Sequence, residues 1–183
     1  MGDAGHVVQT ARTSLRPVSM QDVGYLHRLW TDPAVRRFFW DDEVITRGRA
    51  EAAVREAVED CGRHGLGLWI SERREGVVDP VGFCGLRHRD GGPEVEVLYG
   101  ISPAKWGRGY ATEIAPETIG YGFERVGLAR VRGIADAENG ASRRVLEKVG
   151  MTFEGCVVND GREEARYAKR AEDFQRVSPA ARG

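Results

Sequence analysis

Two glycines stand where a strand gives way to a helix, a pairing that is typical of a phosphate-binding turn. Residues 96–101 have the composition of a strand, a turn begins at Pro103, and Gly107 and Gly109 lead into a helix expected to start at Tyr110. The first turn of a helix carries unpartnered N–H groups and the positive end of the helix dipole, so it attracts anions. Glycines let the backbone curve closely around a phosphate. The stretch therefore predicts a phosphate-bearing ligand.

Two well-known phosphate motifs do not fit this turn. A P-loop requires a Gly-Lys-Ser/Thr sequence after its glycines, and this chain has none after the turn. The dinucleotide pattern has Thr112 where its third glycine belongs, and Asp136, the next acidic residue at a strand end, lies beyond the spacing of about 20 residues that a ribose contact needs. A nucleotide-dependent oxidoreductase is therefore disfavoured. If only the two glycines are considered, the alternative that this is a strand–helix turn with no ligand remains possible.

The composition is that of one ordinary globular domain. The chain has 183 residues, of which 41% are hydrophobic and 30% charged, and its formal net charge is −1. That charge gives no electrostatic reason to expect nucleic acid as a partner, and no apolar run approaches the roughly 18 residues of a membrane-spanning helix. The 3 cysteines are widely spaced, which fits reduced thiols in a cytoplasm. The histidines show no metal-ligand spacing, so no metal is expected.

Hydrophobic periodicity and helix-breaking residues predict the elements that must position these candidates. The expected helices cover residues 23–31, 47–64, 110–125 and 140–149, and the expected strands cover residues 13–18, 66–71, 77–86, 94–101, 129–135, 153–158 and 166–169. This order indicates an α+β fold with a mostly antiparallel first half and a βαβ-like crossover in the second. We expect a disordered leader at 1–12, one domain at 13–177 and a frayed tail at 178–183.

Pro116 lies inside the helix expected at residues 110–125. Proline has no N–H, so it removes the helical hydrogen bond to the carbonyl of Thr112 and costs roughly 3 kcal/mol. The sequence therefore predicts a bend or a widened turn near residues 112–116.

Two motifs resemble the GNAT superfamily of acetyl-CoA-dependent N-acetyltransferases, and within it the ribosomal-protein (RimJ/RimL-like) branch. The superfamily's pyrophosphate motif, Gln/Arg-x-x-Gly-x-Gly/Ala, corresponds to Trp-Gly-Arg-Gly-Tyr-Ala at 106–111. Its initial tryptophan departs from the superfamily but is usual in the branch. The second match, at 139–151, resembles the branch's Asn-x-x-Ser…Leu-Glu-Lys-x-Gly-Phe segment. Shorter matches lie at 14–17, 121–124 and 172–174, so the resemblance covers about residues 13–175.

The resemblance implies a GNAT fold, with acetyl-CoA as co-substrate, no metal, and a primary amine as acceptor. The expected fold is a mixed, mostly antiparallel sheet of about six to seven strands, flanked by about four helices and splayed at the central strand, with Gly100 as the break. N–H groups of residues 107–112 would bind the pyrophosphate, and the strand at 98–101 would pair with the pantetheine arm. A homodimer is also allowed. The implied cofactor-binding residues are Leu98, Ile101, Trp106, Gly107, Arg108, Gly109, Tyr110, Ala111, Thr112, Asn139 and Ser142.

The resemblance also implies catalytic positions. An N–H group near Tyr99 would stabilise the oxyanion, and Glu96 on the central strand is the candidate general base. The alternative for Glu96 is a surface residue or a partner of a nearby arginine. Many superfamily members have a tyrosine general acid where Leu146 stands, so here the leaving thiolate takes its proton from water or another group, or leaves unassisted. Ser142 and Tyr167 are the candidates to replace the missing tyrosine as general acid.

The amine acceptor is expected to approach from the N-terminal helices. Phe39 and Trp40, with Phe38 before them, could form an aromatic wall, and Asp41, with the next two acidic residues, could form its rim. Core aromatics followed by a solvated turn explain the same residues equally well. Asn139 could likewise serve only as the N-cap of the next helix.

An acetyl-CoA-dependent N-acetyltransferase that acts on a protein N-terminus or a small amine is therefore the first hypothesis. A catalytically silent acyl-CoA-binding or regulatory module with the same fold is the alternative from another class.

Overall fold

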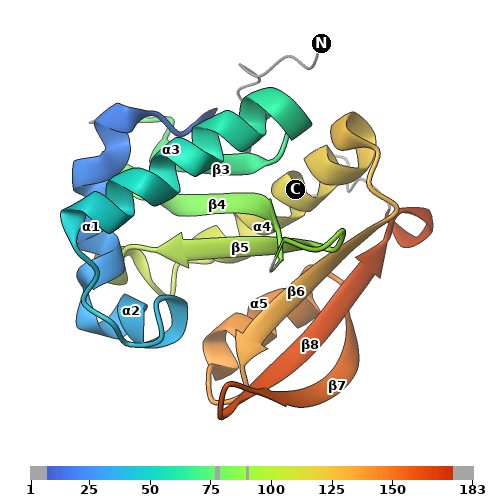
Figure 1. Ribbon diagram of the computed structural model, residues 1–183. Helices are drawn as coiled ribbons and strands as arrows, with labels where there is room; N and C mark the ends of the chain where they lie inside the picture. The colour runs from blue at the N-terminus through green and yellow to red at the C-terminus, as the bar shows by residue number, and fades with distance from the viewer. Residues whose placement is uncertain (1–7, 77–78, 90, 175–183) are drawn as a thin grey trace.

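The computed structural model describes residues 8–76, 79–89 and 91–174, which form one mixed sheet flanked by helices (Figure 1). Its strands are β1 (Val8–Gln9), β2 (Thr13–Pro17), β3 (Gly67–Arg73), β4 (Pro80–His88), β5 (Val95–Ile101), β6 (Arg130–Asp136), β7 (Thr152–Asn159) and β8 (Arg162–Arg170). Its α-helices are α1 (Val23–Thr31), α2 (Pro33–Phe39), α3 (Arg47–His64), α4 (Tyr110–Tyr121) and α5 (Gly140–Lys148). The described residues thus hold one strand and one α-helix more than expected, namely β1 and α2.

The sheet has the order β1-β2-β3-β4-β5-β6-β8-β7. Every neighbouring pair is antiparallel except β5 and β6, which are parallel. A parallel pair needs a crossover connection, and α4 supplies it. The prediction of an α+β fold with an antiparallel first half and one crossover is confirmed.

The sheet is splayed between β5 and β6, as expected (Figure 1). The two strands pair only at Glu96 with Arg132 and at Val97 with Gly133. Beyond Val97, β5 stays paired with β4 along its other edge, whereas β6 diverges. The separation therefore begins before Gly100, which is not the break. A Cβ at Gly100 would stand 2.5 Å from the ring of Phe83, so this glycine instead makes room for a core aromatic.

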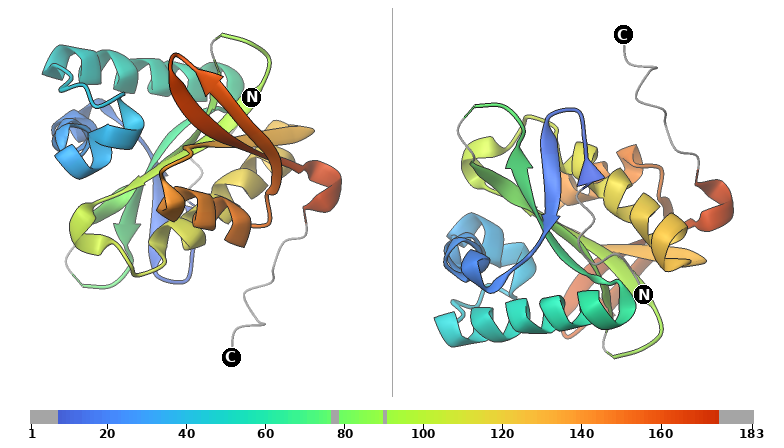
Figure 2. Two further views of the ribbon diagram at one scale, coloured as in Figure 1. Left: turned by 90° about the horizontal axis from the view of Figure 1, so that it is seen from below. Right: turned by 90° about the horizontal axis from the view of Figure 1, so that it is seen from above.

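The two faces of the sheet are covered by different helices (Figures 1 and 2). Alternation along the strands turns Leu68, Phe83 and Leu98 toward α1, α2 and α3. The residues between them face the other way, where Cys84 and Tyr99 pack toward α4 and its neighbours. Each face of the sheet carries buried apolar side chains. The gap between β5 and β6 connects one face of the sheet with the other.

Local capping explains why α3 has the bounds that the sequence predicts. The Thr46 side chain accepts a hydrogen bond from the N–H of Arg49 at 3.2 Å, and Gly65 ends the helix with a φ of 70°. Both are standard end signals, an oxygen-bearing N-cap and a left-handed C-cap glycine. Neither depends on tertiary contacts.

The expectation of a disordered leader is wrong for residues 8–12. Val8 pairs with Leu15 in the β1–β2 hairpin, and Thr10 is only 8% exposed. The Thr10 hydroxyl also accepts from the N–H of Thr13 at 2.9 Å, and the N–H of Thr10 donates to the Thr13 carbonyl at 2.8 Å. Polar hydrogen bonds rather than apolar periodicity hold this segment, so the sequence pattern did not reveal it. Residues 1–7 and 178–183 lie outside the described residues.

Two further expectations about helices need correction. Asp32-Pro33 ends α1 but also starts α2, because Asp32 accepts from the N–H of Ala34 and proline is favoured in a first helical turn. Pro116 does not widen the helix near residues 112–116, since α4 stays α-helical through it and the wider π turn comes later, at Gly122–Val126. No helix among the described residues is both long and apolar enough to cross a bilayer.

Candidate active site

The glycine turn presents a row of available N–H groups. Gly107 and Gly109 have φ values of 72° and 77°, a left-handed conformation that other residues adopt only with strain. Among the described residues, none offers an acceptor in hydrogen-bonding geometry to the N–H groups of residues 107–112. The Trp106 indole is also fixed, since it donates to the carbonyl of Ile101 at 2.7 Å. The turn is thus preorganised to bind an anion at the start of α4.

A groove with a volume of about 1890 Å³ runs from this turn through the gap between β5 and β6 to the side of α1–α3. At one end it is lined by the glycine turn and α5, and at the other by aromatic and charged side chains of α2, α3, β4 and β8. It collects most of the residues that the sequence proposes for the site, and those it leaves out are Arg108, Tyr167, Asp42 and Glu43. The members are Phe39, Trp40, Asp41, Glu96, Leu98, Tyr99, Ile101, Trp106, Gly107, Gly109, Tyr110, Ala111, Thr112, Asn139 and Ser142.

The hydroxyl groups of Tyr99 and Ser142 meet in the middle of this groove. The Tyr99 hydroxyl lies 3.0 Å from Ser142 Oγ and donates to the Ser142 carbonyl at 3.1 Å. Burial raises the pKa of Tyr99 to about 12, although the bond with Ser142 acts in the opposite direction. Tyr99 is therefore a proton-bearing group at neutral pH. Asn139 accepts from the N–H of Ser142 at 3.0 Å, so it does act as the N-cap of α5.

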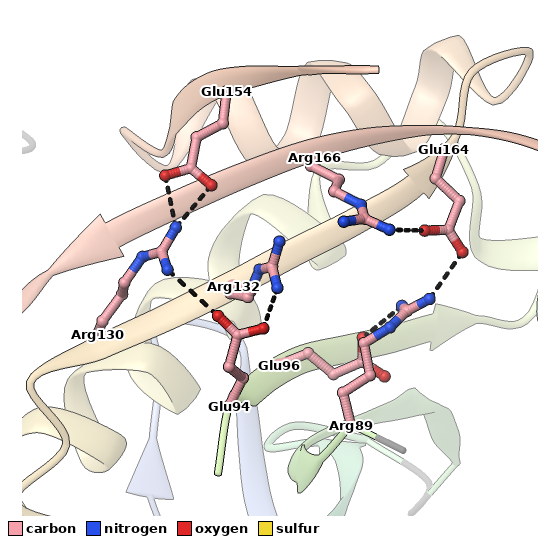
Figure 3. A network of polar contacts seen from close by, with 8 residues as sticks. All are labelled: Arg89, Glu94, Glu96, Arg130, Arg132, Glu154, Glu164 and Arg166. Atoms are coloured by element: carbon pink, nitrogen blue, oxygen red, sulfur yellow. Dashed lines mark hydrogen bonds and ion pairs between the residues drawn. The ribbon is translucent and has the colours of Figure 1, made fainter. Parts of the chain in front are cut away.

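Glu96 lies in the part of β5 that pairs with β6 and is held by two arginines, of which Figure 3 shows Arg89. It is 4% exposed, and its two carboxylate oxygens accept from Arg87 Nε at 2.7 Å and from Arg89 Nη1 at 3.2 Å. Arg89 also bonds Glu164 of β8 at 2.8 Å, which ties β4 to β8 across the gap. Burial acts to raise the pKa of Glu164, but the bonds from Arg89 and Asn159 outweigh it and lower the pKa. The expectation that Glu96 pairs with a nearby arginine is confirmed, and both of its carboxylate oxygens are engaged by arginines.

A second group of arginine–carboxylate pairs lies at the start of β5 and β6 (Figure 3). Glu94, just before β5, pairs with Arg130 and Arg132 of β6. Arg130 in turn donates to both oxygens of Glu154 on β7, at 2.5 and 2.7 Å. These pairs join the segment before β5 to β6 and β7 at the closed end, where β5 and β6 have not yet separated.

Comparison with known proteins identifies the family. A family model described as an acetyltransferase (GNAT) domain matches residues 12–152, well over half of the chain. The chain belongs to the GNAT acetyltransferase family.

Individual relatives agree with this assignment. The GNAT enzyme is 28% identical over 156 residues to the uncharacterized N-acetyltransferase YoaA of Bacillus subtilis, covering 82% of this chain and 85% of YoaA. It is 31% identical over 192 residues to the FsC-acetyl coenzyme A-N(2)-transacetylase of Aspergillus fumigatus, covering 93% and 78%. A solved structure of RimL, a ribosomal L7/L12 α-N-protein acetyltransferase, in complex with coenzyme A has a TM-score of 0.77 at 16% identity, covering 92% of this chain and all of that one. At that identity the likeness is one of fold.

Of the three residues discussed in connection with a general acid, Leu146 and Tyr167 do not reach the groove, whereas Ser142 does. Leu146 of the GNAT enzyme is buried beneath β6. Tyr167 is fully buried, and its hydroxyl donates to Glu147 at 3.0 Å and accepts from Arg143 at 3.2 Å. Tyr167 is therefore not a substitute acid, whereas Tyr99, whose side chain the sequence reasoning did not use, lies beside Ser142.

The aromatic residues at the acceptor end belong both to the core and to the groove. Trp30 stacks on Phe39 at 5.8 Å between ring centroids and meets Trp40 edge-on at 5.5 Å, and all three line the groove. The acidic rim is smaller than expected, because only Asp41 lines the groove. Its neighbours instead pair with arginines of α2 and α3.

Within the described residues, no group of three or more His, Cys, Asp or Glu side chains could hold a metal ion. The groove is therefore built from backbone N–H groups, two hydroxyls, aromatic rings and arginine–carboxylate pairs.

Proposed function

We propose that this enzyme transfers the acetyl group of acetyl-CoA to a primary amine, and that the amine attacks the thioester directly while both substrates are bound. One observation carries the proposal: a single groove joins the anion-binding turn to an aromatic, charged end through the gap between β5 and β6. Two substrates that enter from opposite ends would meet beside Tyr99 and Glu96. Holding both reactants in one geometry supplies much of the rate enhancement.

The cofactor end would hold coenzyme A by backbone groups. N–H groups of residues 107–112 would bind the diphosphate, and the edge of β5 from Leu98 to Ile101, which has no β6 partner, would pair with the pantetheine arm. Asn139 and Ser142 would contact the arm from α5. The shared fold with RimL, which has been solved with coenzyme A, supports this placement.

Glu96 is the proposed general base. It would take the proton that the attacking ammonium loses, directly or through a water molecule, so that the nitrogen lone pair can form the new C–N bond. An N–H group near Tyr99 would stabilise the negative charge that develops on the carbonyl oxygen. Because Arg87 and Arg89 already bond both carboxylate oxygens of Glu96, we expect the rate enhancement from this base to fall at the low end for such catalysis.

Ser142 and Tyr99 are the proposed proton source for the leaving group. When the C–S bond breaks, the Ser142 hydroxyl would pass its proton to the thiolate and regain one from solvent, while Tyr99, 3.0 Å away, would stabilise the negative charge on Ser142 Oγ by turning its hydrogen bond to that atom. This pair would do the work that a tyrosine at position 146 does in many relatives.

The acceptor end suits an amine with an apolar body. Phe39 and Trp40 offer ring faces, and Asp41, whose side chain is 85% exposed and lies 3.7 Å from Arg162 Nη1, offers a carboxylate for which an ammonium group would compete with that arginine. A protein N-terminus and a small-molecule amine both fit this description. Cysteines 61, 84 and 156 form no disulfide, which suits the proposed cytoplasmic location, and a homodimer stays a prediction that light scattering would test.

A catalytically silent acyl-CoA-binding module is the second candidate. The observation that favours it is the engagement of both Glu96 oxygens by arginines. Such a module would bind acetyl-CoA but would not release its thiol in the presence of amines.

A thiol-release assay with acetyl-CoA and a panel of amines tests the proposal. We expect turnover with at least one amine class, and we expect Glu96→Gln to lower kcat about 100-fold, because general bases contribute roughly 10²–10⁴-fold. Glu94→Gln is the matched control, since Glu94 is also paired with two arginines but does not line the groove.

Binding without turnover for any amine would support the silent module instead. Equal turnover in the Glu96→Gln and wild-type enzymes would remove Glu96 from the mechanism while leaving the cofactor assignment intact.

A further inference from the structure

The N-terminal segment before β2 is attached to the start of α4. The backbone N–H of Arg12 donates to Glu113 Oε1 at 2.8 Å, and Arg12 Nε donates to Oε2 of the same carboxylate at 2.6 Å. The Thr10 hydroxyl also donates to Glu113. Figure 2, right, shows the β1–β2 hairpin, in blue, beside the beginning of α4, in yellow. Three donors from one short segment therefore converge on a single carboxylate in the first turn of this helix.

Arg12 also contacts the glycine turn itself. Its Nη1 donates to the carbonyl of Arg108 at 2.9 Å, and its guanidinium lies 4.5 Å from the ring centroid of Tyr110. Neither Arg12 nor Arg108 nor Glu113 lines the groove, whereas Gly109 and Tyr110 do. Arg12 thus supports the turn without itself lining the groove.

This contact determines where one N–H group points. The carbonyl of Arg108 and the N–H of Gly109 belong to the same peptide unit, which is planar and trans, so the two groups point in opposite directions. Because Arg12 holds the carbonyl on the far side, the N–H of Gly109 faces the groove that Gly109 lines. A left-handed glycine next to this peptide would otherwise allow the plane to rotate.

We propose that Arg12 is a positioning residue for the diphosphate of coenzyme A: it anchors the Arg108 carbonyl and the Glu113 carboxylate behind the turn, and so presents the N–H of Gly109 to the ligand. This role rests on the proposed function and adds to it a side chain from outside the glycine motif. Arg12 does not touch the ligand.

The charge of Glu113 is part of the same arrangement. Burial acts to raise the pKa of Glu113, but the hydrogen bonds from Thr10 and Arg12 outweigh it and lower the pKa, so the carboxylate is ionised at neutral pH. An unneutralised carboxylate one turn from bound diphosphate would repel it. The fork of the guanidinium can bond both this carboxylate and the Arg108 carbonyl, which a lysine ammonium cannot do with the same geometry.

The test compares ligands with and without the diphosphate. Binding of coenzyme A, ADP and pantetheine to wild type and Arg12→Ala is measured by NMR titration, which follows weak binding and reports the Gly109 amide signal directly. We expect Arg12→Ala to weaken coenzyme A and ADP about tenfold, to leave pantetheine within about twofold, and to reduce the ADP-induced shift of the Gly109 amide. Arg12→Lys should lie between the two.

Arg63→Ala is the matched control, since Arg63 is an exposed arginine paired with Glu59 and does not line the groove. Equal losses for pantetheine and ADP, or unchanged ADP affinity in both Arg12 variants, would overturn the positioning role. Absence of coenzyme A binding to the wild-type protein would instead contradict the proposed function itself.

Discussion

The two ends of the groove are built from different materials. At the cofactor end the binding groups are backbone N–H groups of one short segment, shaped by two left-handed glycines. At the acceptor end they are side chains from α2, α3, β4, β5 and β8, held by aromatic stacking and by ion pairs such as Arg89 with Glu96 and Glu164. A binding site made of backbone groups from one segment depends mainly on residues that are neighbours in the sequence. A site made of side chains from distant elements depends on how those elements pack.

Replacing the cofactor-end glycine gives the largest expected effect. Gly109→Val places a β-branched residue at a φ of 77°, where L-residues are strained, so the turn must change shape and its N–H groups lose their common direction. We expect calorimetry to show coenzyme A affinity about 100-fold weaker, with the KM of the amine little changed.

Gly127→Val is the matched control for that experiment. Gly127 has a nearly identical φ of 78° and open space around it, but it lies outside the groove. A similar loss of coenzyme A affinity in this variant would mean that the Gly109 effect reflects general backbone strain.

Trp40→Ala tests the acceptor end of the groove in the way that Gly109→Val tests the cofactor end. This change removes a ring that lines the groove and meets Trp30 edge-on, so it takes away apolar surface from the acceptor and about 1 kcal/mol of aromatic contact from the core. We expect steady-state kinetics to show the KM of the amine raised about tenfold and the KM of acetyl-CoA within twofold. If the KM of acetyl-CoA rose equally, the two ends would not be separable.

Tyr99→Phe, in the middle of the groove, should have the smallest effect. It removes one hydrogen bond to Ser142, so we expect kcat to fall about fivefold, in keeping with a net worth of roughly 1 kcal/mol for one such bond. Tyr99 has a raised pKa of about 12, so it keeps its proton as the pH rises through 10. The ratio of wild-type to variant kcat should therefore stay constant from pH 7 to 10.

A fall in that ratio near pH 10 would show that Tyr99 ionises like an exposed tyrosine. Ser142→Ala and the double variant complete the cycle, and if the two hydroxyls act as a unit, the double variant should be no slower than Ser142→Ala alone.

The structural elements with local signals were predictable. Thr46 and Gly65 bracket α3 by capping alone, and the strands at β2, β3 and β5 follow from short apolar runs between turns. The glycine turn was equally readable, because backbone conformation at residues 107–109 depends on the residues themselves. The comparison with relatives confirms the family that these local motifs resemble.

Other features could not be predicted because their partners are far away in the sequence. Arg12 and Glu113 are separated by 101 positions, so nothing near Thr10–Thr13 marks the segment as folded. The pairing of β5 with β6 stops at Val97, three residues before Gly100, and no local sequence signal marks that position. That two arginines bond Glu96 could be known only once Arg87 and Arg89 had been placed beside it.

The sequence by itself determined the ends of α1 and α3 and the left-handed turn at Gly107 and Gly109, because each follows from interactions between residues a few positions apart. Only the tertiary structure decided which hydroxyl meets Ser142, which arginines hold Glu96, and that Arg12 supports the turn from behind. These contacts join different strands and helices, and their free energy is gained only when the sheet brings those elements together.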